Sequence, residues 1–181
     1  MTDDDRRYLE AFPAWLTSLA DDATALAVVL EAVGTPESAR RKAACGLNYL
    51  FKSLDLVPDG IDDIGYLDDA FVLRVAARDA LAAGGEDLDG RLEKLAGEVA
   101  LVQEFLGPDY ERLHAYVDDL ATGSTRGRSV EDIVHKADVR ADLVRDVHGF
   151  ARGYTAPSFT REEKTLVKLR SFLQARLPAA R

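Results

Sequence analysis

Apolar residues recur every three or four positions along most of this chain, and this spacing predicts helices that each bury one face. No run alternates apolar and polar residues with the β-branched content that is typical of strands. Helices are predicted at about residues 5–19, 21–33, 36–52, 67–83, 87–106, 108–121, 129–147 and 160–177. We therefore expect an all-α fold, a compact bundle of about eight helices.

Start and stop signals support these boundaries. Gly34 is expected to end the second helix, and Thr35-Pro36-Glu37 to begin the third with a capping hydroxyl, a proline and an acidic first turn. Thr160-Arg161-Glu162-Glu163 fits a capping box at the last helix. Residues 123–128 are predicted to form a flexible loop. Pro13 is expected to kink the first helix or delay its start.

The helical pattern lapses at about residues 53–67, between the third and fourth predicted helices, where one proline and two glycines interrupt it. Residues 55–69 contain six aspartates and no lysine or arginine. The sequence therefore predicts an acid-rich corner between two packed helices. The apolar side chains expected to be buried around it are Leu47, Leu50, Phe51, Leu54, Ile61, Ile64, Phe71, Val72 and Val75.

Two five-residue blocks follow Tyr49, namely Asp55-Leu56-Val57-Pro58-Asp59 and Gly65-Tyr66-Leu67-Asp68-Asp69. With this separation, residues 40–80 resemble the signature of the bacterial YkvA-like family, domain of unknown function 1232. The chain departs from that signature at Ser53 and Asp62, where prolines are common in the family. The resemblance implies a small helical unit over about residues 38–83 and no established activity.

The first interpretation of the corner is structural. Asp55 would accept backbone N–H groups of the following turn, Pro58 would fix that turn, and Asp59 would cap the next segment. Asp68 or Asp69 would cap the helix that follows. The predicted structural or binding residues are Asp55, Pro58, Asp59, Gly65, Tyr66, Asp68 and Asp69.

Two other interpretations stay open beside this favoured one. Clustered carboxylates can bind a hard cation such as Mg²⁺ or Ca²⁺, although the spacing fits neither an EF-hand loop nor an Asp-Asp-x-x-Asp helix motif. The candidate ligands are Asp59, Asp62, Asp63, Asp68 and Asp69. The same acids could instead form a docking surface for a basic partner.

Composition narrows the class of protein. The chain has 181 residues, of which 47% are hydrophobic, so a single domain over residues 1–181 can bury a core. Its net charge of −9 argues against nucleic-acid binding, because phosphates repel an acidic surface. The acidic start is unlike a signal peptide, and no run approaches the roughly 18 apolar residues of a membrane span. We expect a cytoplasmic bacterial protein.

Other chemistry is sparse. His114 and Asp118 lie four residues apart on one predicted helix face, where a surface hydrogen bond is favoured over half of a metal site. His135 and His148 are expected to be ordinary surface or core side chains. Cys45 is expected to be a small packing residue, and no nucleophile elbow or phosphate-binding glycine loop occurs.

These observations favour a non-enzymatic interaction or scaffold module with no cofactor. The alternative is a divalent-metal protein, with hydrolysis as its candidate chemistry, that uses the aspartates of residues 55–69. Residues 161–181 carry six basic and two acidic side chains. This basic helix is predicted to dock on an acidic surface of its own chain, of a second copy or of another protein, and peripheral membrane contact is a further option.

Overall fold

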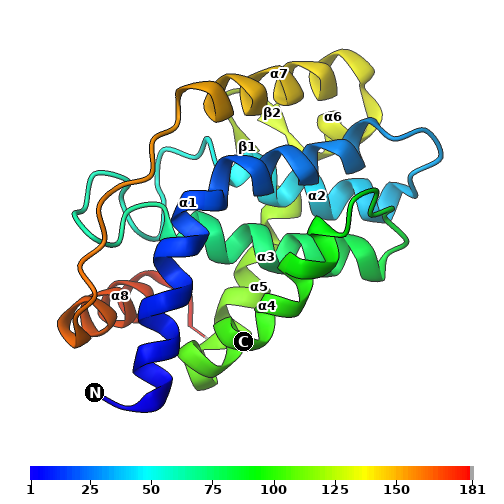
Figure 1. The fold of residues 1–181 in the computed structure, drawn as a ribbon. Helices are drawn as coiled ribbons and strands as arrows, with labels where there is room; N and C mark the ends of the chain where they lie inside the picture. The colour runs from blue at the N-terminus through cyan, green and yellow to red at the C-terminus, as the bar shows by residue number, and fades with distance from the viewer. Residues whose placement is uncertain (180–181) are drawn as a thin grey trace.

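The computed structural model describes residues 1–179, and the all-α prediction is confirmed (Figure 1). Seven helices have ten residues or more, one fewer than the eight predicted, and α6 adds a single short one. The elements are α1 (Asp3–Glu31), α2 (Glu37–Tyr49), α3 (Leu67–Ala82), α4 (Arg91–Leu106), η1 (Gly107–Asp109), α5 (Tyr110–Asp119), η2 (Leu120–Thr122), β1 (Ser124–Thr125), β2 (Arg128–Ser129), α6 (Val130–His135), α7 (Ala137–Gly153) and α8 (Glu163–Arg176).

The first two predicted helices are one helix, α1, which changes direction part-way along (Figure 1). Pro13 lies inside it, and the Thr17 hydroxyl donates to the Pro13 carbonyl at 3.0 Å, a side-chain bond that bends helices. The predicted break between residues 19 and 21 is wrong, because α1 continues through it. Asp22 is buried and accepts hydrogen bonds from Ser18 and Arg91.

The long helix predicted from Ser129 is two helices, α6 and α7, separated by the extended residue Lys136. The Arg140 guanidinium donates to the carbonyls of Ile133 and Val134, so a tertiary contact satisfies the exposed end of α6. Ser129 is the N-cap of α6, and its hydroxyl accepts from the Asp132 N–H at 3.0 Å.

The predicted flexible loop at residues 123–128 is a short antiparallel hairpin, in which Ser124 pairs with Ser129. Its two turn residues, Arg126 and Gly127, have φ values of 51° and 75°. Two successive positive φ values are typical of a type I′ turn, whose twist matches that of a hairpin. The hairpin escaped prediction because only Gly127 of the two is a usual residue for such a turn.

Two helices begin near their predicted positions, but the predicted capping side chains do not cap them. Pro36 is the N-cap of α2, without a side-chain cap from Thr35, and α8 begins at Glu163 without the predicted capping box. Leu54, which was expected to be buried, is 79% exposed, whereas Phe51 and Ile61 are partly buried. The other six apolar side chains predicted to surround the corner are buried.

Helix α3 lies in the middle of the bundle, with α1 and α7 on one side and α4 and α5 on the other (Figure 1). Its Phe71 is fully buried and meets Phe12 of α1 and Phe105 of α4 edge-on. The core therefore joins α1, α3 and α4 through aromatic contacts as well as aliphatic ones.

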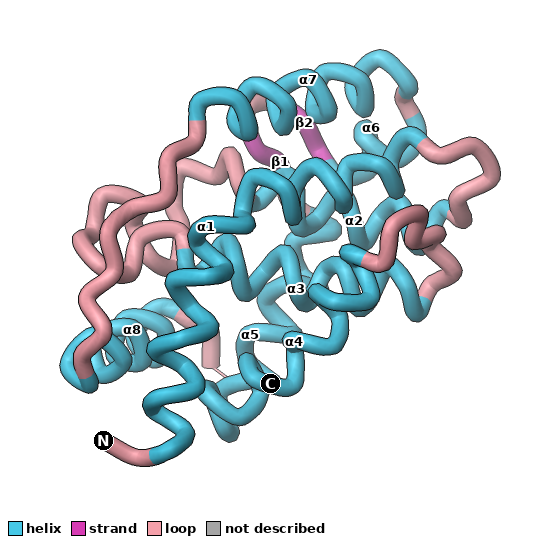
Figure 2. The backbone as a smooth tube through the Cα atoms, in the orientation of Figure 1, coloured by secondary structure: helices cyan, strands magenta, loops and turns pink. Residues whose placement is uncertain are grey.

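Helix α8 packs on its own chain beside the first part of α1 (Figure 1). It buries Leu166, Leu169 and Leu173, and its Arg170 guanidinium lies 4.4 Å from the centre of the Phe105 ring. Figure 2 shows the loop that leads into α8 beside the loop between α2 and α3. No helix within residues 1–179 has the length and apolarity needed to cross a membrane.

Candidate functional site

We define the acidic corner as residues 50–69, the connection between α2 and α3 together with the first turn of α3. Asp68 is fully buried at its centre. Asp68 Oδ2 accepts hydrogen bonds from the Tyr49 hydroxyl at 2.5 Å and from the Val57 N–H at 3.0 Å. The Tyr49 hydroxyl accepts in turn from the Leu56 N–H at 2.8 Å. Two side chains from two helices therefore satisfy two successive backbone donors of the connection.

The expected role of Asp55 is therefore wrong, because Tyr49 and Asp68 bind the N–H groups of the turn instead. The cap expected from Asp68 or Asp69 is also wrong: α3 already begins at Leu67 and has no side-chain cap. Tyr49, at the start of the motif, is the residue from which these hydrogen bonds could have been predicted. The hydroxyl of a tyrosine on the last turn of a helix can bind backbone N–H groups of the loop that follows the helix.

Little positive charge balances the buried acids of the corner, although Lys52 acts to lower the pKa of Asp55. Asp55 Oδ1, Asp68 Oδ1 and Asp69 Oδ2 are buried without a hydrogen-bond partner among the described residues. Burial raises the pKa of Asp68 to about 6, although its bonds from Tyr49 and Val57 act in the opposite direction. Burial and the nearby carboxylates raise the pKa of Asp55 to about 7, and raise that of Asp69 well above its ordinary value. The corner therefore favours protons or a bound cation.

Asp62 and Asp63 lie apart from these buried acids. Asp63 Oδ1 accepts from the Thr160 N–H at 2.7 Å, and the Asp62 main-chain carbonyl accepts from Lys168 Nζ at 2.9 Å. Both residues thus hold the C-terminal segment. Within residues 1–179, the five predicted metal ligands do not supply three ligand atoms within 4.8 Å of one another. Metal binding by the corner stays a prediction.

Gly65 and Tyr66 close the corner on itself. A Cβ atom at Gly65 would lie 2.2 Å from the Asp59 carbonyl oxygen, so only glycine allows this approach of two backbone segments. Tyr66 follows in the left-handed region at φ 66°, which is uncommon for a tyrosine. Pro58 contributes its carbonyl, which accepts from the Ile61 N–H at 3.0 Å. These contacts fix the course of the chain beside Asp59.

Asp59 and Tyr66 also line a cleft of about 540 Å³ between the corner, the hairpin and α7. The Phe51 and Phe150 rings meet edge-on inside it, and the Arg126 guanidinium lies 4.9 Å from the centre of the Phe51 ring. We call it the arginine-lined cleft. Its lining residues are Leu50, Phe51, Asp59, Tyr66, Arg126, Arg145, Asp146, Gly149, Phe150 and Arg152.

The lining of this cleft has one more arginine than it has acids, namely Arg126, Arg145 and Arg152 against Asp59 and Asp146. Asp146 is neutralised by Arg128 at 2.7 Å, with Arg126 at 3.8 Å, and Arg145 pairs with Asp142. Arg152 is exposed and makes no hydrogen bond or ion pair with another described residue. The sequence did not reveal this site, because its arginines come from the hairpin and from two turns of α7 and meet only in the fold.

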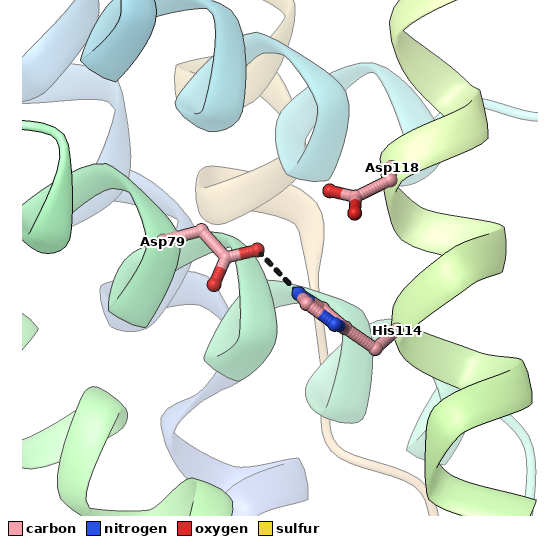
Figure 3. Close-up of side chains that lie close together, drawn as sticks. All are labelled: Asp79, His114 and Asp118. Carbon is pink, nitrogen blue, oxygen red and sulfur yellow. Dashed lines mark hydrogen bonds and ion pairs between the residues drawn. The ribbon is translucent and has the colours of Figure 1, made fainter.

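A third group of side chains lies near the C-terminal end of α3. The hydrogen bond expected between His114 and Asp118 does not form. His114 contacts Asp79 of α3 instead, with 3.1 Å between His114 Nε2 and Asp79 Oδ2 (Figure 3). One ligand atom from each of Asp79, His114 and Asp118 lies within 4.8 Å of the others. The sequence showed two members of this group, and folding brings the third.

No protein-family model, curated protein or solved structure matches this chain. The resemblance to the YkvA-like family thus stays a prediction that rests on the two motif blocks.

Proposed function

We propose that this chain is a non-enzymatic interaction module that binds an acidic protein segment in the arginine-lined cleft. The observation that carries the proposal is an arginine rim around aromatic rings in a chain whose net charge is −9. A cluster of positive charge on an acidic protein favours a local anionic partner over general electrostatic attraction.

The lining suggests what such a segment contains. Phe51, Phe150 and Tyr66 offer apolar and aromatic surface, and the cleft volume suits one or two large side chains. Arg152 is free to pair with a carboxylate of the partner, and an arginine can do so through two parallel hydrogen bonds. The favoured partner therefore places an aromatic side chain between acidic ones.

The acidic corner has a supporting role in this proposal. Tyr49 and Asp68 hold the connection that carries Asp59 and Tyr66 to the cleft. A binding surface on a firmly held loop loses less conformational entropy when a partner docks. Nucleophilic chemistry is disfavoured at the one cysteine, because burial raises the pKa of Cys45 to about 12.

Fluorescence anisotropy tests the proposal with a labelled peptide in which glutamates flank a central Phe-Trp pair. Arg152→Glu should weaken binding at least about tenfold, which corresponds to about 1.4 kcal/mol. The matched control is Arg161→Glu, since Arg161 is also exposed and unpaired among the described residues, and it should change the Kd by less than about twofold.

A peptide with Gly-Ser in place of Phe-Trp should bind more weakly to the wild-type protein, because it leaves the aromatic rings uncovered. If Arg152→Glu and Arg161→Glu weakened peptide binding equally, the effect would come from the net charge of the protein and not from the cleft. This result would overturn the proposal. Failure of the acidic peptide to bind would also overturn it.

One observation favours a second candidate function, divalent-cation binding by the acidic corner. Asp68 Oδ1 and Asp69 Oδ2 are buried without partners, and a Mg²⁺ or Ca²⁺ ion would relieve their repulsion. Either ion should then raise the melting temperature, by about 2.7 kcal/mol of stabilisation at a hundred times its Kd. Asp69→Asn should abolish the shift, and no shift in the wild-type protein would exclude this function at the concentrations tested.

A further inference from the structure

Three potential metal ligands meet between α3 and α5, away from both the acidic corner and the cleft. Asp79 comes from α3, and His114 and Asp118 lie one turn apart on α5. Figure 3 shows the three side chains directed toward one another across the space between the two helices. Their ligand atoms lie within 4.8 Å of one another. Tetrahedral ligands of zinc stand about 3.3 Å apart, so small side-chain rotations would close this group around an ion.

The donor set selects the class of ion. One imidazole nitrogen and two carboxylate oxygens suit Zn²⁺ and its first-row neighbours such as Co²⁺. Mg²⁺ and Ca²⁺ prefer ligand sets made only of oxygen. The side chains of Asp79, His114 and Asp118 are 12%, 32% and 45% exposed, which leaves room for a water molecule as the fourth ligand.

Neighbouring cations orient both carboxylates, which is a separate observation. Lys42 Nζ lies 2.6 Å from Asp118 Oδ1, and Arg78 donates to Asp79 Oδ1 at 3.2 Å. Each cation thus uses Oδ1, and Asp79 Oδ2 is the oxygen that faces His114. Hydrogen bonds to the outer oxygen of a ligating carboxylate are a common feature of metal sites, because they fix the direction of the inner oxygen.

We propose that Asp79, His114 and Asp118 form a binding site for a zinc-class divalent ion that links α3 to α5. The ion replaces the hydrogen bond between His114 and Asp79 with direct bonds to both. Lys42 and Arg78 hold the carboxylates in place, but their positive charges repel the ion and lower its affinity. The site shares no residue with the arginine-lined cleft, so its failure would leave the proposed function untouched.

Isothermal titration with ZnCl₂ tests the site in the full chain, and MgCl₂ is the comparison ion. We expect one zinc per chain and no detectable magnesium binding here. His114→Gln should weaken zinc binding at least about tenfold, since it keeps a polar side chain beside Asp79 but removes the imidazole. The matched control is His148→Gln, since His148 is exposed and unpaired among the described residues, and it should leave the affinity unchanged.

Lys42→Gln gives a test with the opposite sign. Glutamine keeps a hydrogen-bond donor for Asp118 but carries no positive charge, so zinc binding should tighten by about threefold or more. Lys164→Gln, at an exposed lysine on α8, which carries none of the three ligands, should have no such effect. Co²⁺ offers a second readout, because a bound ion acquires visible absorption bands that His114→Gln should remove. Zinc binding that is absent, or unchanged by His114→Gln, would overturn the proposal, as would weaker binding in Lys42→Gln.

Discussion

Helix α3 carries two buried charged regions that differ in how their charge is balanced. Arg74 is 1% exposed and is surrounded by partners. Its guanidinium lies 2.8 Å from Glu98, 3.5 Å from Asp22 and 4.0 Å from the centre of the Trp15 ring, and it donates to the Ala70 carbonyl. Burial lowers the pKa of Arg74, while Glu98 and Asp22 act to raise it. Two acidic neighbours therefore balance the buried positive charge of Arg74.

The charge of the acidic corner, about one and a half turns earlier on α3, is not balanced. Asp68 and Asp69 are as buried as Arg74, but each keeps a carboxylate oxygen without a partner, and residues 55–69 contain no basic side chain. A balanced buried charge stabilises one structure when all its partners are present. An unbalanced one makes stability depend on protons or ligands. The comparison thus separates a structural centre from a region that can respond to its surroundings.

The largest effect is expected when the balanced region is broken. Arg74→Met keeps the volume of the side chain but leaves Asp22 and Glu98 without their shared cation. The free energy of unfolding should fall by about 3–5 kcal/mol, which lowers Tm by roughly 10 °C for a chain of this size. Urea unfolding followed by circular dichroism measures the loss. The control Arg161→Met should be neutral, and a loss below about 1 kcal/mol for Arg74→Met would show that the two acids find other partners.

A smaller loss is expected at the hydrogen bonds of the corner. Tyr49→Phe removes one hydroxyl, which leaves the buried Leu56 N–H unsatisfied and takes a donor from Asp68. The expected cost is about 2–3 kcal/mol, because an unmet buried polar group loses its full desolvation energy. Tyr8→Phe is the control, since the Tyr8 hydroxyl makes no hydrogen bond to a described residue. Equal stability of the two variants would contradict the network.

The unbalanced charge predicts an unusual pH dependence. Asp55 and Asp68 have pKa values of about 7 and about 6 in the folded chain, above the ordinary value, so the folded state holds their protons more tightly than the unfolded state does. Stability should therefore fall as the pH rises from about 5 to 8. The expected loss is at least about 1–2 kcal/mol, and it comes from the buried Asp68 and Asp69 more than from Asp55, whose charge solvent screens.

Asp69→Asn should flatten this slope, since it removes a fully buried carboxyl whose own pKa is raised well above its ordinary value. Acids with a lowered pKa, such as Asp5, act in the opposite direction, but only below about pH 5. Thermal melts in buffers of equal ionic strength measure the slope. Stability that rises between pH 5 and pH 8 would mean that the buried carboxyls have partners in solution.

The smallest effect is expected at an exposed acid of the same corner. Asp62→Asn should change the free energy of unfolding by less than about 0.5 kcal/mol, because Lys168 binds the main-chain carbonyl of Asp62 rather than its side chain. Its pH slope between 5 and 8 should match that of the wild type. A slope as flat as that of Asp69→Asn would mean that Asp62 contributes to the pH dependence as the buried acids do. The distinction between buried and exposed acids of the corner would then fail.

Local pattern predicted much of this molecule but not where charges meet. Helical periodicity located α2, α3, α4 and α5 within a few residues, because an amphipathic stripe marks the buried face. The division of α1 was misread, since Asp22 binds the distant Arg74 and Arg91. The break between α6 and α7 was missed, since the Arg140 guanidinium binds the last carbonyls of α6 from the next helix. The candidate site followed the same rule. Its aspartates were visible in the sequence, whereas Tyr49 and the arginines of the cleft were not assigned to it.

The sequence by itself determined the helical class, the corner between α2 and α3 and the concentration of aspartates there. These depend on periodicity, proline, glycine and charge, which act over a few residues. Only the tertiary structure decided which aspartates are buried, that Asp62 and Asp63 face the C-terminal segment, and that Asp79 joins His114 and Asp118. Burial and pairing depend on residues far apart in the chain, and their energies arise only when packing removes water from between them.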